Sequence, residues 1–597
     1  MALVHLNSAP ILVSLHSVFG SSKAMAPFLA ARSRSGSTSC PLQFMAHNKT
    51  SSEKTNITRR SANYQPPIWP FDYVQSLASK YAGETYKKRV NELKEEVKML
   101  LVKVRDPLAK LEHIDILQRI GLSYHFEAEI KTILERLYNN SSFDDTWKQN
   151  NLYATALEFR LLRQHGFWLP QEVFKGFKDE KAGTFKASMS DDAKGMLSLY
   201  EASFHLVKGE SFLEEARDLS TKHLQQYISN KEASEDEIVV LINHALEIPL
   251  HWRMLRLEAR WFIDVYDKRK DMNPTLLELA KLDFNVVQST HQEDLKHASS
   301  WWRHTRLGQK LKFARDRLME NFLWTVGIGF EPQLGYCRRI GAKVICIITV
   351  IDDVYDLYGT LEELELFTDA IERWDMDAVD ELPDYMKLCF LILHNFIHET
   401  AFDVLKEQKL LVIKNLKKVW ADLCRCYLVE AKWYYNGYTP SLEEYMENAW
   451  ISVGGPVVLT HAFFSVTNPI QEKALKCLEK YPSIIRSSSM ILRFADDLGT
   501  SSNEIERGDV PKSIQCYMHQ SGASEEEARQ HIKFLISEIW KQMNEDQKEN
   551  SPFCKTNLGR MAQCMYQHGD GHGVQDRETK DRVLSLLINP ISHYEQL

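Results

Sequence analysis

Apolar residues recur at helical spacing along almost the whole chain beyond residue 58, whereas the alternating patterns typical of strands are rare. Examples are Ile114-Leu117-Ile120-Leu122 and the stretch from Leu276 to Val287. This spacing places apolar side chains on one face of a helix, so the sequence predicts an all-α fold. The 597 residues are 44% hydrophobic, which is enough for about two to four domains with ample core.

A polar break at Asp271-Met272-Asn273-Pro274 divides the helical region in two. Proline is favoured in the first turn of a helix, so a new helix is expected to begin here. We therefore expect two helical domains, covering residues 59–270 and 271–597.

The first 52 residues contain no Asp or Glu and are rich in Ser and Ala, with occasional Arg or Lys. This composition is typical of an organelle transit peptide, and an ordinary disordered tail is the alternative. A secretory signal is disfavoured because the apolar stretch Ile11–Leu15 is short. Residues 1–58 are therefore expected to form a targeting segment.

Charge and cysteine content narrow the function further. The net charge of -8 and a pI near 6.3 provide no basic field, so nucleic acid is not an expected partner. No apolar run reaches the length of about 18 residues that spans a bilayer, so no membrane partner is expected. The ten cysteines are scattered without paired C-x-x-C motifs, which favours reduced core residues over a zinc site or a disulfide framework.

Three carboxylates, Asp352, Asp353 and Asp356, follow the apolar run Ile345–Ile351, where unpaired charge is costly. At about 3.6 residues per turn, Asp352 and Asp356 project from the same helix face, with Asp353 beside them. Oxygen ligands with this spacing suit Mg²⁺ or Mn²⁺, which complete their coordination with water and substrate phosphate. A solvated acidic helix end is the alternative for an isolated motif of this kind.

A second acidic cluster covers residues 493–504. Asp496, Thr500 and Glu504 are spaced so that one helix face offers two carboxylates and a hydroxyl. Two such faces opposed across a cavity can hold several divalent ions around a diphosphate. The alternative is a capped or broken acidic helix, because Gly499 and Thr500 are poor helix formers.

Together with the tandem arginines Arg59-Arg60 and Trp69, these motifs resemble those of angiosperm monoterpene synthases, class I members of the plant terpene synthase family. The resemblance covers nearly the whole chain beyond residue 58. Arg315-Asp316-Arg317, about ten helical turns before the first acidic motif, and Gly508-Asp509-Val510-Pro511-Lys512-Ser513 fit the same pattern. The chain looks closest to the myrcene- and alpha-terpineol-forming members.

The resemblance implies a C-terminal catalytic α-bundle and an N-terminal relic α-barrel domain that lacks the D-x-D-D acid motif of protonation-initiated cyclases. It implies metal-dependent ionisation of geranyl diphosphate in the plastid stroma, with three Mg²⁺ or Mn²⁺ ions per active site, by a monomer or homodimer. The C10 product is expected to be acyclic, such as myrcene or ocimene, or cyclic, such as alpha-terpineol, pinene or sabinene.

The family motifs also imply roles for individual residues. Asp353 is better suited to orienting a ligand or a basic neighbour than Asp352 or Asp356 are. Guanidinium groups can hold phosphate oxygens in a bidentate manner, and a structural ion pair is the alternative for any single arginine. The expected metal ligands are Asp352, Asp353, Asp356, Asp496, Thr500 and Glu504, and the expected diphosphate contacts are Arg315, Arg317, Arg493 and Lys512.

The other end of the cavity must stabilise a carbocation. Trp324, Tyr427 and Tyr566 match aromatic positions of the family and could do so through cation–π attraction, with core packing as their alternative. Ser452 is a further expected substrate contact. The residues Gly454, Gly455 and Pro456 that follow it should break the helix and turn backbone carbonyl dipoles toward the cation. A plain packing kink is the alternative.

The tandem arginines Arg59 and Arg60 are associated in the family with isomerisation of the substrate to a form able to cyclise. Physically, this segment would fold across the mouth of the active site and exclude water, with Trp69 anchoring it in a groove. Alternatively, an arginine pair here belongs to the targeting signal.

Competing functions are weakened by particular residues. Isoprene synthases carry Phe at the positions of Ile345 and Leu492, so a five-carbon substrate is disfavoured. A chain-elongating prenyltransferase would carry a second D-D-x-x-D where this chain ends the motif with Thr500. A sesquiterpene synthase acting on farnesyl diphosphate and a non-catalytic metal-binding helical scaffold are the remaining alternatives.

Overall fold

The computed structural model describes residues 59–140, 147–178, 186, 192–231, 236–550, 554–574 and 576–592. These residues are mostly helical and contain no β-strand, which confirms the predicted all-α class. Arg59–Leu597 form one compact unit. The expected targeting segment, residues 1–58, lies outside the described residues.

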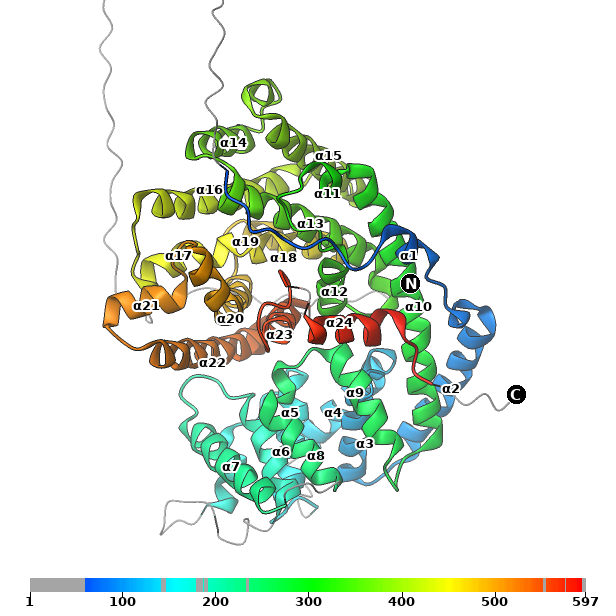
Figure 1. Cartoon of the computed structure of the whole chain (residues 1–597). Helices are drawn as coiled ribbons and strands as arrows, with labels where there is room; N and C mark the ends of the chain where they lie inside the picture. Colours follow the sequence, from blue (N-terminus) through cyan, green and yellow to red (C-terminus); the bar gives the residue numbers. More distant parts are fainter. Residues whose placement is uncertain are drawn as a thin grey trace, which may run out of the picture. The chain divides into compact units, whose positions relative to one another are not determined.

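A first group of helices lies between residues 71 and 267 (Figure 1). Each buries an apolar stripe, as in α2, where Val90, Leu93, Val97 and Leu101 recur at helical spacing. The elements are α1 (Phe71–Ser76), η1 (Lys80–Ala82), α2 (Glu84–Lys103), α3 (Pro107–Arg119), η2 (Ser123–His125), α4 (Glu127–Asn140), α5 (Leu152–Gln164), η3 (Gln171–Phe177), α6 (Ala193–Ser203), α7 (Ser211–Ser229), α8 (Glu237–Glu247), η5 (Leu250–Trp252) and α9 (Leu255–Asp267).

A second group follows to the end of the described chain. Its helices are α10 (Pro274–Thr305), α11 (Leu307–Lys310), α12 (Leu318–Ile328), η6 (Pro332–Leu334), α13 (Gly335–Asp353), η7 (Val354–Tyr358), α14 (Leu361–Arg373), η8 (Asp377–Glu381), α15 (Asp384–Gln408), α16 (Ile413–Asn436), α17 (Leu442–Ser452), α18 (Gly455–Val466), α19 (Glu472–Leu478), α20 (Ser483–Arg507), α21 (Ser513–Ser521), α22 (Glu525–Asn550), α23 (Cys554–Met565), α24 (Arg577–Val583) and η9 (Leu584–Ile588).

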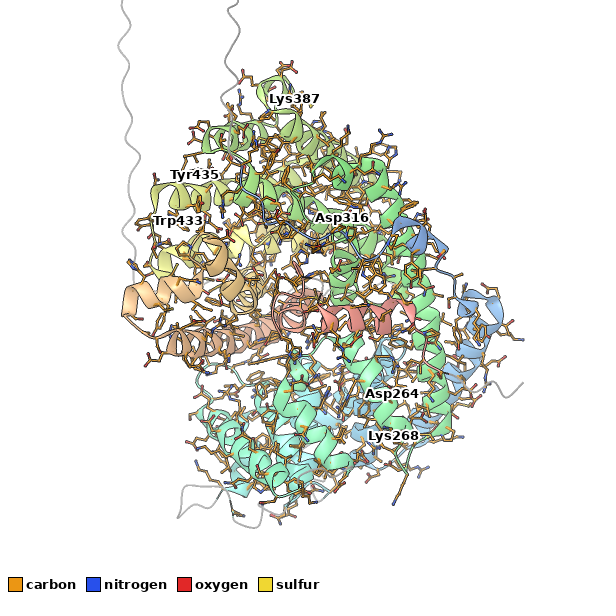
Figure 2. All side chains as sticks on the ribbon, viewed as in Figure 1. Asp264, Lys268, Asp316, Lys387, Trp433 and Tyr435 are labelled. Carbon is orange, nitrogen blue, oxygen red and sulfur yellow. The ribbon has the colours of Figure 1, made fainter. Side chains whose placement is uncertain are left out.

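Helix α10 begins at the predicted polar break. Asn273 caps it, its side-chain oxygen accepting from the backbone N of Leu276 at 3.2 Å, and Pro274 occupies the first turn. The helix packs against α2 and α9 of the first group and against α12 and α13 of the second. One apolar core cluster therefore extends from Val74 to Ile591 through both groups, and side chains fill the spaces between the helices (Figure 2).

Two described stretches, Asp384–Gln408 and Leu442–Val466, are long and apolar enough to cross a membrane by length and composition. Of their most apolar windows, 44% and 67% respectively is buried inside the protein, as in the core helices of a helical bundle. The second stretch is interrupted, since α17 ends at Ser452 and α18 begins at Gly455.

The cysteines whose side chains are described are all free, and all but Cys477 are buried. Small buried thiols pack as apolar groups. The expectation of reduced core cysteines is confirmed for this part of the chain.

Candidate active site

The Arg-x-Arg motif and the first acidic motif meet at one end of a helical hairpin. The sequence length between them predicts about ten helical turns, and the structure folds that length into α12 and α13 with a bend around Gly329 and Pro332. The backbone N of Arg315 donates to Asp353 Oδ2 at 2.7 Å, its Nε lies 3.0 Å from Asp353 Oδ1, and its Nη2 lies 2.5 Å from Asp352 Oδ2.

The expectation that a regular helix carries the whole first motif is wrong for its last turn. α13 ends at Asp353, and residues 354–358 form a wider π turn in which Gly359 N donates to Val354 O at 2.8 Å. Asp352 and Asp356 remain electrostatic neighbours, because burial and then the charge of Asp352 raise the pKa of Asp356. Asp353 is only 1% exposed, so the motif is not a solvated helix end.

Helix α20 carries the second acidic motif and continues through Gly499 without a break. The guanidinium of Arg493 pairs with Asp496 and, through Nη2, lies 2.6 Å from Asp497 Oδ1. The hydroxyl of Thr500 donates to the backbone O of Asp496 at 3.0 Å. The side chain of Glu504 lies outside the described residues.

Glycine is required at position 499 for packing rather than as a helix breaker. A Cβ there would lie 2.9 Å from the backbone O of Gly569 and 3.0 Å from the Cβ of Tyr566. The loop after α23 therefore lies directly against α20. The alternative of a broken helix does not hold.

Burial and neighbouring charges shift the carboxyl groups at both motifs. Burial raises the pKa of Asp353 to about 6 although Arg315 opposes the shift, and it raises the pKa of Asp496 to about 6 although Arg493 opposes it. The charges of Asp353 and Asp497 raise the pKa of Arg315 and Arg493, respectively, despite their burial. Both arginines are therefore held cationic beside acidic partners.

Sequence reasoning did not assign a role to Asp497, which the structure places at the centre of a buried network. It is 0% exposed, accepts from the hydroxyl of Tyr445 at 3.1 Å and accepts from the backbone N of Ser513 at 3.0 Å. Its position four residues after Arg493 was an available signal, because side chains at that spacing meet on a helix. Asp497 thus links α17, α20 and α21.

The missed residue Glu430 joins two predicted ones. Lys512 Nζ lies 3.7 Å from Glu430 Oε2, the Ser452 hydroxyl donates to the same carboxylate, and Asn448 Nδ2 donates to Glu430 Oε1 at 3.1 Å. The predicted helix break is present: α17 ends at Ser452 and Gly454 has φ +79°. No local pattern in the sequence marks Glu430.

The three predicted aromatic residues occupy two places. Trp324 and Tyr566 face each other with ring centroids 6.1 Å apart, and Tyr566 hydrogen-bonds Asp496. Tyr427 packs against Tyr355 with centroids 5.3 Å apart. Burial, then Asp352 and Asp356, raise the pKa of Tyr427, which places its hydroxyl within the field of the first motif.

His572 completes the wall beside Trp324 and was not anticipated. Trp324 Nε1 donates to His572 Nδ1 at 3.2 Å, and His572 Nε2 lies 3.4 Å from the Thr349 hydroxyl. Burial, with Arg315 and Arg317 adding to it, lowers the pKa of His572 to about 3, so the ring is neutral. The glycines around it indicate a turn in the sequence but not where the turn packs.

The tandem arginines lie on the end of the first acidic motif. Arg59 donates to Glu363 Oε1 at 2.7 Å and to Tyr358 O at 2.7 Å. Arg60 donates to Asp356 O at 3.0 Å and to Asp509 Oδ1 at 2.6 Å. Between Arg60 and Asp356 a cavity of only about 10 Å³ remains, so this segment covers the motif.

Trp69 and Arg317 are placed differently from the other predicted residues. Trp69 packs against the core with its ring 6.0 Å from that of Tyr73. Arg317 is 2% exposed and donates to the backbone carbonyls of Gln65 and Gly573.

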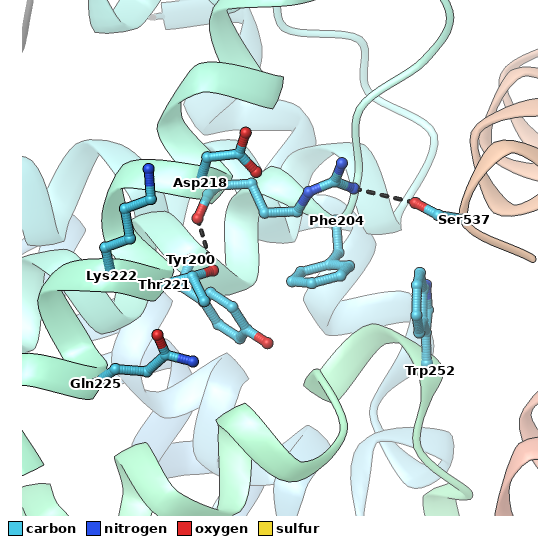
Figure 3. A pocket seen from close by; sticks show the side chains of 9 residues that line it. Tyr200, Phe204, Asp218, Thr221, Lys222, Gln225, Trp252 and Ser537 are labelled. Carbon is cyan, nitrogen blue, oxygen red and sulfur yellow. Dashed lines mark hydrogen bonds between the residues drawn. The ribbon is translucent and has the colours of Figure 1, made fainter. Parts of the chain in front are cut away.

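A larger cavity of about 410 Å³ lies away from every predicted site residue (Figure 3). Within its lining, Arg217 Nη1 donates to the Ser537 hydroxyl at 3.2 Å. Its lining comes from α6 and the residue after it, α7, η5 and α22: Tyr200, Phe204, Arg217, Asp218, Thr221, Lys222, Gln225, Trp252 and Ser537. The chemistry of the acidic motifs therefore does not take place there.

The donor set of the two acidic motifs fits a hard divalent ion. Asp352, Asp356, Asp496 and Thr500 offer only oxygen atoms, and each motif already holds a guanidinium cation against its carboxylates. Among the described side chains, no three His, Cys, Asp or Glu groups are placed to hold one ion. Mg²⁺ typically takes one or two carboxylates and completes its octahedron with water and phosphate oxygens.

Two family models match the chain. Residues 303–542 match the "Terpene synthase family, metal binding domain" and residues 68–246 match the "Terpene synthase, N-terminal domain". Among curated proteins, the chain is 61% identical to a chloroplastic myrcene synthase of Quercus ilex over 99% of both chains. It is 62% identical to a (-)-alpha-terpineol synthase of Vitis vinifera over 90% of this chain and 91% of the relative.

Solved structures agree with this pattern. Limonene synthase with 2-fluorolinalyl diphosphate superposes with a TM-score of 0.87 at 49% identity, covering 90% of this chain and 100% of that one. Isoprene synthase from grey poplar, in complex with three Mg²⁺ ions and dimethylallyl-S-thiolodiphosphate, superposes with a TM-score of 0.80 at 46% identity, covering 89% and 100%.

Proposed function

Because this chain belongs to the terpene synthase family, we propose that its two acidic motifs and their arginines jointly ionise geranyl diphosphate. The chain is a monoterpene synthase, a lyase that acts on a diphosphate and uses divalent metal. The observation that carries the assignment of the site is the pairing of each acidic motif with an arginine that is largely shielded from solvent, Arg315 with Asp352 and Asp353, and Arg493 with Asp496 and Asp497.

Ionisation breaks an allylic C–O bond and builds negative charge on the departing diphosphate. Arg493 and Lys512 are buried and Arg315 is partly buried; all three cations contact carboxylates, and they would turn to phosphate oxygens in the complex. Divalent ions, when bound, neutralise the leaving group and fix its position. We assign them to Asp352, Asp356, Asp496, Thr500 and Glu504, with Asp353 orienting Arg315.

The carbocation end of the site is assigned to aromatic faces. Trp324, Tyr427 and Tyr566 are buried or half-buried next to the acidic motifs, where cation–π attraction can stabilise positive charge without trapping it. Ser452 stands at the break between α17 and α18. Water is excluded by the segment that carries Arg59 and Arg60, and we assign this pair to isomerisation before cyclisation.

Three further assignments concern the number of metal ions, the cellular location and the domain boundaries. Three ions per site are proposed because the isoprene synthase structure holds three Mg²⁺. Delivery to the plastid stroma is proposed because the Quercus relative is chloroplastic and the first 52 residues lack Asp and Glu. Residues 59–270 and 271–597 are proposed as the relic and the catalytic domain.

The product is proposed to be a C10 monoterpene of the myrcene or alpha-terpineol type, since relatives of both types share about three-fifths of the sequence. Both follow from one cation. Proton loss before cyclisation gives an acyclic triene, whereas ring closure followed by attack of water gives a cyclic alcohol.

The test is gas chromatography with mass detection on the purified protein incubated with geranyl diphosphate and Mg²⁺. We expect C10 products that disappear with EDTA and with Asp352→Ala, and that persist with the exposed control Asp369→Ala on α14. A clear preference for farnesyl diphosphate would make the protein a sesquiterpene synthase. Full turnover after Asp352→Ala would support a non-catalytic role for the acidic motif.

A further inference from the structure

Arg317 holds two backbone segments that are far apart in the sequence. Its Nη1 donates to the backbone O of Gln65 at 3.0 Å, and its Nε and Nη2 donate to the backbone O of Gly573 at 3.3 and 3.2 Å. Gln65 belongs to residues 59–69, here called the N-terminal segment. Gly573 belongs to residues 569–574, here called the glycine-rich loop, which follows α23.

The position of Arg317 is too enclosed for a surface ion pair. The residue is 2% exposed and immediately precedes α12. Its guanidinium also donates to the backbone O of Asp316 at 3.1 Å, and within the described residues all of its hydrogen bonds go to backbone carbonyls. A buried cation needs such acceptors, because a buried charge without hydrogen-bond partners is strongly destabilising.

The N-terminal segment covers the first acidic motif. Arg59 and Arg60 fasten its start to Tyr358 and to Asp356 and Asp509. Further along, the ring of Tyr64 lies 5.4 Å from the guanidinium carbon of Arg315. The bond from Arg317 to Gln65 is the next attachment along this segment.

The glycine-rich loop contacts Trp324, one of the aromatic residues predicted to stabilise the carbocation. Asp570 Oδ1 accepts from the backbone N of Gly573 at 2.6 Å and from that of His572 at 3.2 Å. His572 in turn accepts from Trp324 at 3.2 Å. Hydrogen bonds therefore connect the residue whose carbonyl Arg317 holds, Gly573, to His572 and Trp324.

We propose that Arg317 is a positioning residue that closes the N-terminal segment and the glycine-rich loop together over the proposed active site. The planar guanidinium has donors on two edges and can hold two carbonyls at once, which a single ammonium cannot do with the same geometry. Loss of this bridge opens both segments at the same time. This differs from a diphosphate contact, for which both segments would be independent of Arg317.

The catalytic consequence rests on the proposed function. When water enters, its oxygen forms a C–O bond to the carbocation and a proton leaves to the solvent, so that an alcohol replaces a hydrocarbon. The reaction needs no oxidant or reductant. Opening of either segment should therefore raise the alcohol share of the products.

The first test is hydrogen exchange measured by mass spectrometry on the full chain, which does not depend on activity. In Arg317→Lys we expect exchange to rise about three- to tenfold in both the N-terminal segment and the glycine-rich loop, as for the loss of one or two net hydrogen bonds. A rise in only one segment, or in neither, overturns the proposal.

Arg338→Lys is the matched control. Arg338 is 1% exposed and donates to the backbone carbonyls of Gly329 and Glu331 and to Asp294, so it is a similarly buried carbonyl-binding arginine that contacts neither segment. Its substitution should lower stability without raising exchange in the two segments. If Arg338→Lys raises exchange there equally, the effect is general loosening and the proposal fails.

Gly573→Ala tests the bridge without changing Arg317. A Cβ at Gly573 would lie 2.4 Å from Asp570 Oδ2, so the Asp570 carboxylate must shift, and we expect it to release the backbone N of His572 and Gly573 and so loosen the loop that Arg317 holds. Exchange should then rise in the N-terminal segment, whereas Gly176→Ala, which has open space around it, should have no such effect. An unchanged N-terminal segment in Gly573→Ala overturns the coupling.

The second readout is the incorporation of ¹⁸O from labelled water into C10 products. Arg317→Lys should raise the labelled alcohol-to-hydrocarbon ratio several-fold, and Arg338→Lys should not. If the wild-type protein makes no C10 product, the proposed function fails, and the exchange experiment still decides the role of Arg317. An unchanged ratio in an open variant overturns the water-excluding role.

Discussion

Two neighbouring aspartates of the first acidic motif differ in exposure and in partners. Asp353 is 1% exposed and receives both the backbone N and the side chain of Arg315. The side chain of Asp352 is 26% exposed and contacts Arg315 through one oxygen. Asp352 therefore has a lone pair available for an ion, while Asp353 is occupied in holding the arginine.

We expect Asp352→Asn to raise the Mg²⁺ concentration needed for half-maximal activity by more than about tenfold. Asp353→Asn should lower kcat about 10- to 100-fold with a smaller change in Mg²⁺ dependence, because it loosens Arg315 rather than removing a ligand. A Mg²⁺ titration of both variants measures the difference. Identical Mg²⁺ curves would show that Asp353 binds the ion directly.

The sequence predicted residues that stand in motifs and missed those whose partners lie far along the chain. Arg315 contacts Asp352, and Arg493 contacts Asp496, so each predicted arginine lies beside one of the predicted acidic motifs. Glu430 accepts a hydrogen bond from Ser452, which is 22 residues away in the sequence, and His572 accepts one from Trp324, which is 248 residues away. Such pairs are decided by how helices pack, and helical periodicity carries no information about them.

At the level of secondary structure, the break between α17 and α18 depends on one glycine. Gly454 has φ +79°, and a Cβ there would lie 3.1 Å from Ile348 Cδ1 on α13. The position is therefore strained for any other residue and also in contact with the helix that carries the first acidic motif.

Gly454→Ala should lower stability by about 1–2 kcal/mol from backbone strain and also change the product distribution, because the side chain pushes on α13. Gly437→Ala is the control, since Gly437 has φ +61° and open space around it. It should show the loss of stability with unchanged products. Thermal unfolding and gas chromatography measure the two effects. If Gly454→Ala leaves the products unchanged, the break between α17 and α18 does not shape the active site.

Helix ends were predictable where the signal is local and unpredictable where packing decides. Asn273-Pro274 begins α10 through a cap and a favourable first turn. The wide turn at residues 354–358 has no such marker, since Val354 and Tyr355 are ordinary apolar residues that lie buried. The wide turn changes the position of Asp356 relative to a regular helix, whereas helical periodicity in the sequence predicts a regular helix there.

At the scale of the whole molecule, a buried polar network joins the two groups of helices. Arg560 Nε on α23 donates to His251 O at 2.8 Å, and His251 Nε2 lies 2.8 Å from Asn544 Oδ1 on α22. Asn544 Nδ2 donates to Phe204 O and Leu206 O, both at 2.9 Å. These bonds tie η5 and the residues that follow α6 in the first group to α22 and α23 in the second.

The network should make the fold sensitive to acid. Burial, then Arg560, lowers the pKa of His251 to about 3, and Arg160 acts in the same direction. His205, whose ring lies 4.0 Å away, also has a lowered pKa. In the unfolded chain His251 has its ordinary pKa of 6.5 and binds a proton below that pH, whereas in the folded chain its pKa is about 3. The contribution of His251 to the free energy of unfolding is therefore complete above pH 6.5 and is lost as the pH falls toward 3.

Between pH 7 and pH 5, the free energy of unfolding should therefore fall by about 2 kcal/mol less in His251→Gln than in the wild type. Asp353 and Asp496, with pKa values raised to about 6, act in the opposite direction, since their contribution is lost as the pH rises through 6. They are common to both proteins and cancel in the comparison. Urea unfolding at the two pH values measures the slope, with the exposed His519→Gln as the control. Equal slopes for His251→Gln and the wild type would mean that His251 protonates in the folded state, and that the interface tolerates the charge.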